Sequence, residues 1–153
     1  YNTPLEELSL ENYMKIVNVN QVSVFLGMKT VASIMKAQKN GSIINVSSMN
    51  GLVGGAIGYT DTKFAVRGMT KAASRELSPH NIRVNSVHPG VIQTSMLEQE
   101  GVKEQVEQFK KTIPMRRAAQ TEEVSNMIIF LSSEESSYST GSEFVIDGGL
   151  TAL

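Results

Sequence analysis

Two residues that could exchange a proton lie four positions apart in the segment "YTDTK", where Tyr59 is followed by Lys63. The pattern of residues 58–77 predicts a helix, so both side chains would lie on one helix face and could reach the same ligand. A phenol ordinarily loses its proton at about pH 10, but a nearby ammonium lowers the phenol pKa. Tyr59 and Lys63 are therefore a candidate acid/base pair, although this spacing also occurs in helices that have no catalytic role.

Ser48 and Asn20 are candidates for the same site. Ser48 ends the β-branched run "GSIINVSS", and a glycine-containing turn over residues 51–58 would let its hydroxyl face the start of the next helix. There it could hydrogen-bond a carbonyl or alcohol oxygen, although a serine after a strand is often only a turn or capping residue. Asn20 interrupts an apolar helix, where an amide is unfavourable unless it has a partner. A hydrogen bond between helices explains Asn20 as well as a functional role does.

The elements that must position these residues alternate along the chain. The apolar spacing predicts one long, well-buried helix with Ser9 as its N-cap, and later a helix capped by Thr121. The expected helices cover residues 10–38, 58–77 and 122–133, and the expected strands cover residues 41–48, 82–90 and 142–149. This order predicts an α/β fold with right-handed crossovers and a parallel sheet covered by helices on both faces.

Ligands of such sheets bind beyond the carboxyl ends of the strands. The first two strands are expected to end at Ser47/Ser48 and at His88 to Gly90, which is where chemistry is expected. Residues 91–120 are polar and irregular, with room for a short helix over 98–111, and a segment of this length usually covers a binding site. We expect it to form a lid, in which Met96, Leu97 and Phe109 indicate an apolar pocket.

Composition narrows the class of protein. A chain of 153 residues fits one domain, and its net charge of -1 gives no sign of nucleic acid or anionic lipid as a partner. No apolar run reaches the roughly 18 residues of a membrane span. The absence of cysteine excludes disulfides, thiolate catalysis and Cys-ligated zinc, and no metal site is expected. The first residues do not resemble a signal peptide, so we expect a cytoplasmic protein with a small-molecule substrate.

In combination, these motifs resemble the classical short-chain dehydrogenases/reductases. The resemblance rests on "VNVNQVSVF", "GSIINVSS", "YTDTK", "RVNSVHPGVIQT" and "TGSEFVIDGG", which follow the family's order and approximate spacing over essentially the whole chain. It implies a three-layer, doubly wound parallel sheet of the Rossmann type and NAD or NADP as the cofactor.

The resemblance also implies a role for each residue. Tyr59 would be the general acid/base, and Ser48 would fix and polarise the substrate oxygen. Ser47 is the alternative to Ser48, because the gap to Tyr59 is two residues shorter than in the commonest form. Lys63 would lower the pKa of Tyr59 and hold the nicotinamide ribose, while Asn20 would keep a proton-relay water in place. The residues implied in cofactor binding are Tyr59, Lys63, Pro89, Gly90, Ile92 and Thr94.

The family's glycine-rich dinucleotide turn, Thr-Gly-x-x-x-Gly-x-Gly, does not occur in this sequence. The run "GLVGGAIG" at 51–58 is not that turn, because it follows the strand that carries the serine. The residue that selects NAD or NADP is missing as well. We therefore expect residues 1–153 to be a single-domain fragment, the catalytic half of a Rossmann-type dehydrogenase, with the N-terminal cofactor half absent.

The expected function is that of an NAD(P)-dependent oxidoreductase, which interconverts a secondary alcohol (simple, cyclic or steroid) and a ketone. One alternative is a 3-oxoacyl thioester reductase of the same family. Another is a non-catalytic remnant without a dinucleotide site. The resemblance also implies a homotetramer in which the helices over 10–38 and 58–77 pair across a two-fold axis.

Overall fold

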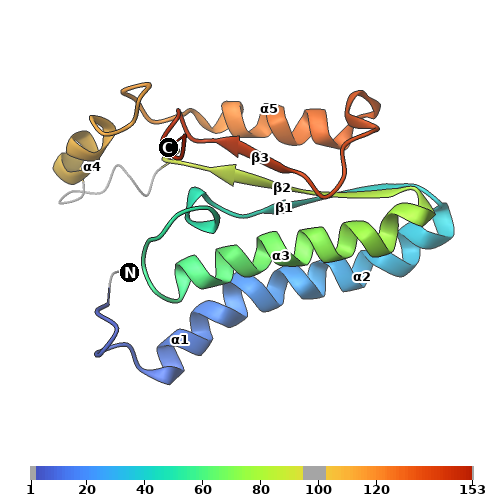
Figure 1. Cartoon of the computed structure of the whole chain (residues 1–153), viewed down its shortest axis with the longest axis horizontal. Helices are drawn as coiled ribbons and strands as arrows, with labels where there is room; N and C mark the ends of the chain where they lie inside the picture. The colour runs from blue at the N-terminus through green and yellow to red at the C-terminus, as the bar shows by residue number, and fades with distance from the viewer. Residues whose placement is uncertain (1–2, 95–102, 153) are drawn as a thin grey trace.

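The structure, a computed structural model, describes residues 3–94 and 103–152 and contains a three-stranded parallel sheet in the order β1-β2-β3. The strands are β1 (Gly41–Val46), β2 (Ile82–Pro89) and β3 (Glu143–Ile146). The helices α2 (Ser23–Gln38) and α3 (Tyr59–Leu77) cover one face, and α5 (Thr121–Ser132) covers the other (Figure 1). The predicted three-layer α/β architecture is confirmed.

The core lies between the sheet and the two helices on one face. Ile43 of β1 and Ile82 and Val84 of β2 pack with Leu77 at the end of α3. Met35 and other partly buried side chains of α2 pack against this cluster. The central strand β2 is buried along most of its length, as expected for a parallel strand with layers on both faces.

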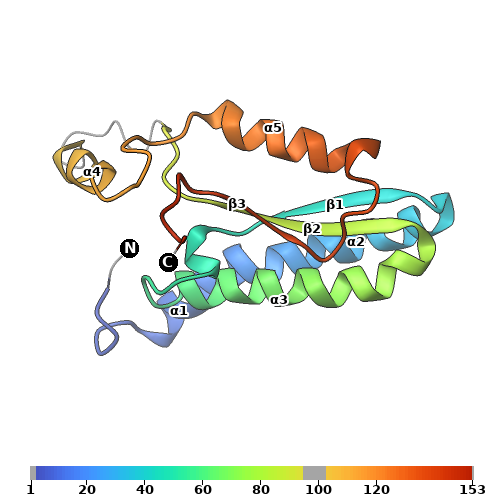
Figure 2. The same cartoon turned by 45° about the horizontal axis from the view of Figure 1, so that its top comes forward.

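The two connections between strands lie on opposite faces of the sheet. The chain passes from β1 to β2 through α3 and from β2 to β3 through α5 (Figure 2). Two crossovers that advance in the same direction on opposite faces must have opposite hands. The expectation of right-handed crossovers is therefore met by one connection only.

The predicted helix over residues 10–38 has three parts. α1 (Leu10–Val17) begins at the predicted N-cap, because Ser9 Oγ accepts a hydrogen bond of 3.2 Å from the backbone N–H of Asn12. The π-helical segment η1 (Asn18–Val22) follows, in which the N–H of Ser23 reaches the carbonyl oxygen of Asn18, and α2 then continues. The expected single helix is thus interrupted by a π turn that contains Asn20.

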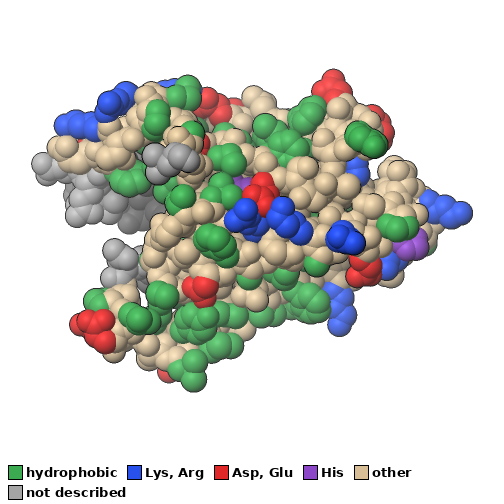
Figure 3. Space-filling model, in the orientation of Figure 1, with side chains coloured by type: hydrophobic (Ala, Val, Ile, Leu, Met, Phe, Trp, Pro, Cys, Tyr) green, Lys and Arg blue, Asp and Glu red, His purple; other side chains and the backbone are tan. Residues whose placement is uncertain are grey.

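The expectation that this helix is well buried is wrong. All residues of α1, η1 and α2 are described, and none of them is buried. Phe25 is 49% exposed and Ile34 is 57% exposed. The reason is that α3 and β1 cover only one side of α2. Hydrophobic side chains consequently gather on the surface over α1 and α2 (Figure 3).

The sequence predicted Thr121 as the N-cap of α5, but the N-cap is Gln120. The backbone N–H of Gln120 donates to the Glu123 carboxylate at 2.7 Å, and the Gln120 side chain accepts from the backbone of Glu123. This reciprocal capping box satisfies two helix-end donors, so the helix begins at Thr121.

The segment over residues 91–120 contains the short helix α4 (Lys103–Lys110), inside the range predicted as 98–111. Ile92 and Ala119 pair as an isolated parallel bridge, so the two ends of the segment lie side by side. Phe109 is 41% exposed, while Met96 and Leu97 lie outside the described residues. In the parts of the chain that the structure describes, no helix is both long and apolar enough to span a membrane.

Candidate active site

The carboxyl ends of the three strands meet at one edge of the sheet. The backbone N–H of Ser47, directly after β1, donates to the Val87 carbonyl oxygen at 2.9 Å. The N–H of Gly90, directly after β2, donates to the carbonyl oxygen of Ile146 at the end of β3, also at 2.9 Å. A Cβ atom on Gly90 would lie 2.8 Å from the Cα atom of Asp147, so only glycine permits this close approach. α3 begins at the same edge (Figure 1).

Tyr59 is the first residue of α3, and Lys63 lies one turn later. Gly58 precedes them with a φ of 82°, a left-handed conformation that favours glycine and turns the chain into the helix. The Nζ atom of Lys63 lies 5.4 Å from the centre of the Tyr59 ring and donates to the Val46 carbonyl oxygen at 3.3 Å. Lys63 thus connects the tyrosine with the end of β1, and burial lowers the pKa of its amine.

The two serines after β1 have different surroundings. The hydroxyl of Ser47 is 3.0 Å from the Lys63 carbonyl oxygen, to which it donates, and its side chain is packed against Gly51. The hydroxyl oxygen of Ser48 accepts a hydrogen bond of 3.2 Å from the backbone N–H of Asn50, which leaves its own proton for another acceptor. Ser47 therefore joins the strand end to α3, and Ser48 is the serine whose hydroxyl can donate to a ligand.

Asn20 reaches the start of α3 through Thr62. Its Nδ2 atom donates to Thr62 Oγ1 at 3.4 Å, and the Thr62 hydroxyl donates to the Tyr59 carbonyl oxygen at 2.7 Å. Both alternatives raised for Asn20 therefore remain compatible with its position, since the bond between helices also joins it to Thr62, within the helical turn from Tyr59 to Lys63. The π turn η1 holds Asn20 there, and π turns are frequent at functional sites.

The four residues expected to line a cofactor lie at or after the end of β2. Pro89 is the last residue of β2, and Gly90 pairs with the end of β3. Ile92 is partly buried in the bridge to Ala119, and Thr94 is exposed. They share the edge of the sheet with Ser48 but come from a different strand.

His88 is a site residue that the sequence did not assign. Its ring nitrogens contact the Ser48 carbonyl oxygen and the Ser86 hydroxyl, and its side chain is fully buried. The available signal was a histidine near the end of the predicted strand "IRVNSVHPG". Within the described residues, no group of three or more His, Asp or Glu side chains is placed to hold a metal ion.

The sequence matches a known protein family over nearly its full length. Residues 1–151 match the family described as Enoyl-(Acyl carrier protein) reductase, a group of short-chain dehydrogenases/reductases. The chain belongs to the short-chain dehydrogenase/reductase family. The resemblance seen in the motifs around Ser48 and Tyr59 is thereby confirmed for nearly the full length of this short-chain dehydrogenase/reductase sequence.

Two similar members of the family are named as dehydrogenases. The chain is 49% identical over 150 residues to a 3-alpha-(or 20-beta)-hydroxysteroid dehydrogenase of Mycobacterium bovis, covering 97% of this chain and 55% of the relative. It is 46% identical over 152 residues to a cyclopentanol dehydrogenase of Comamonas testosteroni, covering 97% of this chain and 61% of the relative. The chain thus spans little more than half the length of these proteins.

The fold also matches a solved structure, a gluconate 5-dehydrogenase from Burkholderia cenocepacia in complex with NADP and tartrate. The TM-score is 0.92 at 28% sequence identity, and the match covers 100% of this chain and 61% of the solved chain. The Rossmann-type fold class is therefore shown for the portion of that fold which this sequence contains.

Proposed function

We propose that the protein is an NAD- or NADP-dependent oxidoreductase that interconverts a secondary alcohol and a ketone. The observation that carries the proposal is the position of the Lys63 amine, which lies between the Tyr59 ring and the end of β1, next to Ser48. An amine, a phenol and a hydroxyl are thus gathered where ligands of parallel sheets bind. The names of the hydroxysteroid and cyclopentanol dehydrogenases support the same reaction type.

In alcohol oxidation, the Ser48 hydroxyl would donate a hydrogen bond to the substrate oxygen, and Tyr59 would accept the substrate's hydroxyl proton as a phenolate. The role proposed for the Lys63 ammonium is to stabilise the negative charge that Tyr59 would carry during proton transfer, because opposite charges attract. In ketone reduction, Tyr59 would return the proton to the same oxygen. Tyr59 is partly exposed at the sheet edge, so its hydroxyl is accessible to a ligand.

The residues at this edge fit a nicotinamide cofactor. The Lys63 ammonium has three N–H donors, and the one that meets Val46 leaves others for the hydroxyl groups of a ribose. Gly90 keeps the backbone after β2 free of a side chain. The residues that would hold the cofactor are Tyr59, Lys63, Pro89, Gly90, Ile92 and Thr94. When bound, the nicotinamide supplies the hydride acceptor or donor, and the protein supplies orientation and the proton path.

The substrate class we propose is a cyclic secondary alcohol or a hydroxysteroid. The short helix α4 lies beyond the carboxyl ends of the strands in both ribbon views (Figures 1 and 2), where a lid over a ligand would sit. Phe109 on α4 is 41% exposed and is therefore an apolar side chain that a ligand could cover. Apolar pocket walls suit a ring with a single polar group.

We also propose that the working protein is a homotetramer in the cytoplasm. The exposed apolar side chains on α1, α2 and α3, among them Phe25, Leu26 and Phe64, support pairing of these helices between subunits. Sedimentation of the active enzyme measures this directly, and a monomer that is folded and active contradicts it.

The experiment that tests the function is cofactor reduction by the purified active enzyme with cyclopentanol, cyclohexanol and a hydroxysteroid, with NAD and NADP in parallel. A 3-oxoacyl thioester assayed with the reduced cofactors tests the alternative substrate class. Tyr59→Phe should reduce turnover by about 100-fold or more and leave cofactor affinity nearly unchanged, because the phenol moves the proton. Activity of Tyr59→Phe within a few-fold of wild type removes Tyr59 from this role. Cofactor binding without turnover of any substrate supports a different function.

A further inference from the structure

His88 is buried at the carboxyl end of β2, with 0% exposure. Its backbone pairs with Val145 of β3, so the strand fixes the position from which the ring projects. Both ring nitrogens have partners: Nδ1 lies 3.0 Å from the Ser48 carbonyl oxygen, and Nε2 lies 2.9 Å from Ser86 Oγ. His88 therefore links the middle of the sheet to the backbone of Ser48.

The partners of His88 decide which nitrogen carries the proton. A carbonyl oxygen can only accept a hydrogen bond, so Nδ1 must be the donor to Ser48. A hydroxyl can donate, so the neutral ring accepts from Ser86 at Nε2. Burial lowers the pKa of His88 and favours this neutral form. The charged groups that face the ring are Glu143 on β3, which opposes the lowering, and Arg67 and Lys71 on α3, which add to it.

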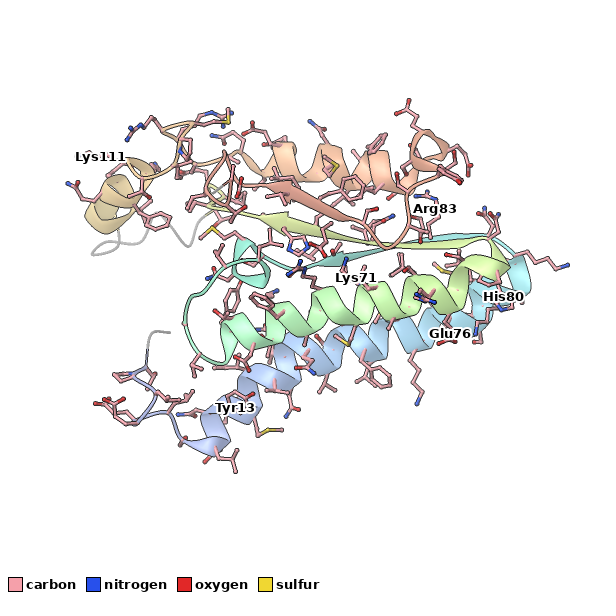
Figure 4. The ribbon with its side chains drawn as sticks, viewed as in Figure 1. Tyr13, Lys71, Glu76, His80, Arg83 and Lys111 are labelled. Carbon is pink, nitrogen blue, oxygen red and sulfur yellow. The ribbon has the colours of Figure 1, made fainter. Side chains whose placement is uncertain are left out.

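The charged groups beside His88 are themselves paired. Glu143 accepts from Arg67 Nε at 2.7 Å and lies 2.8 Å from Lys71 Nζ, and the Lys71 side chain lies between α3 and the strands in Figure 4. One carboxylate thus pairs with two cations on the side of the sheet next to His88. The imidazole is therefore held in a fixed polar environment rather than in contact with solvent.

Ser48 is held at both its carbonyl and its hydroxyl. Its carbonyl oxygen accepts the Nδ1–H of His88 and, at 2.9 Å, the backbone N–H of Gly51. Its hydroxyl oxygen accepts from Asn50 at 3.2 Å. Two donors on one carbonyl fix the peptide plane that follows Ser48, and this plane together with the Ser48 ψ of 164° sets the direction of the Ser48 Cα–Cβ bond. A substitution of His88 would therefore change the direction of the Ser48 hydroxyl, although His88 does not contact that hydroxyl.

We propose that His88 is a positioning residue for Ser48, in which the Nδ1–H group anchors the Ser48 carbonyl oxygen and so aims the Ser48 hydroxyl at the substrate oxygen. The Ser86 hydroxyl keeps the ring in the required tautomer. This inference rests on the proposed function, because it assigns His88 a role in the same alcohol-ketone reaction. His88 does not touch substrate and is not itself a proton donor or acceptor in the reaction.

Two variants of the active enzyme separate positioning from space filling. In His88→Asn the amide nitrogen is bonded to Cγ, as Nδ1 is, and keeps a donor toward Ser48. In His88→Gln the polar atoms lie one bond further out, toward Ser86, and the donor to Ser48 is lost. We expect kcat within a few-fold of wild type for His88→Asn and a loss of about 10- to 100-fold for His88→Gln, with KM for the cofactor unchanged in both.

A space-filling role predicts the opposite order, because glutamine replaces more of the ring volume than asparagine does. If kcat of His88→Gln equals or exceeds that of His88→Asn, the proposal is overturned. The matched control is His80→Asn, since His80 is exposed at the far end of α3 (Figure 4) and should leave kcat and KM unchanged.

The tautomer in the wild-type enzyme gives a test that depends on no variant. Nitrogen NMR of the folded enzyme at neutral pH should show His88 protonated at Nδ1 and unprotonated at Nε2. A ring protonated only at Nε2 cannot donate to Ser48 and overturns the proposal even if both variants fail to fold. This measurement needs no substrate, so it is distinct from a failure of the proposed function, which would appear as wild-type enzyme without turnover.

Discussion

The Lys63 amine lies 5.4 Å from the centre of the Tyr59 ring and donates to the carbonyl oxygen of Val46 at 3.3 Å. The Lys63 ammonium thus lies near the Tyr59 phenol and also contacts the end of β1, the strand that precedes Ser48. Replacement of this charge should affect both the phenol and any ligand bound at the edge of the sheet.

We expect Lys63→Met to lower kcat by about 100-fold or more and also to weaken cofactor binding. The methionine keeps most of the apolar side chain but removes the charge that favours the phenolate and the donors that would meet the ribose. The measurements are steady-state kinetics and calorimetric titration with NAD and NADP. Unchanged cofactor affinity would mean that Lys63 acts on Tyr59 but does not bind the ribose.

Substitution of the two serines should give different results. Ser48→Ala should lower kcat strongly, because its hydroxyl is placed to donate to a ligand, and should lower the melting temperature only by the loss of the bond of 3.2 Å from the Asn50 N–H. Ser47→Ala should lower the melting temperature, because the bond of 3.0 Å to the Lys63 carbonyl oxygen is lost, while kcat falls less. If Ser47→Ala loses more activity than Ser48→Ala, Ser47 is the serine that meets the substrate.

Gly51 has no room for a side chain. A Cβ atom there would lie 2.5 Å from Ser47 Oγ and 3.0 Å from the Lys63 carbonyl oxygen, so Gly51→Ala must push the strand end away from α3. We expect a loss of about 1–3 kcal/mol in the free energy of unfolding and a lower kcat. Gly54→Ala is the matched control, since a Cβ there meets nothing within 4 Å. Equal stability of the two variants in denaturant unfolding would contradict this account of the contact.

Glu123 should make stability depend on pH in the acid range. Hydrogen bonds from Arg117 and from the Gln120 N–H lower the pKa of Glu123 from 4.5 to about 2. Between these values the unfolded chain binds more protons than the folded chain, so the stabilisation is fully present above pH 4.5 and is lost as the pH falls toward 2. Melting curves across this range, with wild type and Glu123→Gln, measure the effect.

The difference in melting temperature between wild type and Glu123→Gln should therefore be constant near neutral pH and shrink in acid. Glu122→Gln is the matched control, because Glu122 lies in the same helical turn but bonds to the Thr121 hydroxyl. A difference that does not change with pH would mean that the ion pair with Arg117 does not produce the stabilisation.

Residues 1–153 expressed alone should associate and show no saturable NAD or NADP binding by calorimetry. β1 is an edge strand of the described sheet, and an open edge beside exposed apolar residues such as Phe25 and Ile34 favours association. The sequence also lacks the glycine turn whose amides would receive the diphosphate. A monodisperse 153-residue chain that binds either cofactor at micromolar concentration contradicts this prediction.

The sequence was sufficient to predict, to within one residue, where α3 begins and where β2 ends, because the helical spacing and the β-branched runs are local signals. β1 was expected to extend to residue 48 but ends at Val46. The sequence could not reveal the π turn, since the apolar spacing continues through Asn18–Val22 with little change. It also placed the cap of α5 one residue late, because glutamine is rarely an N-cap and acts here through Glu123.

Burial was the least predictable property. The apolar residues of α1 and α2 predict that one face of these helices is buried. Their actual exposure depends on which neighbouring elements pack against that face. The contact of His88 with Ser48 was equally hidden, because it joins residues 40 positions apart through the register of two strands. The roles of Asn20, Ser48, Tyr59 and Lys63 remain predictions for the variants above to test.

The π turn η1 also sets the rotational phase between α1 and α2. The i→i+5 hydrogen bonds of η1 enclose one more residue than an α turn does, so the extra residue is taken up locally and the face that α1 turns toward α3 is kept. Tyr13, whose hydroxyl donates to Asp61 at 2.7 Å (Figure 4), lies on that face. Deleting one residue from Asn18–Val22 should therefore convert the π turn into an α turn and leave α1 docked, whereas inserting one residue between Tyr13 and η1 should turn Tyr13 by about 100° away from Asp61.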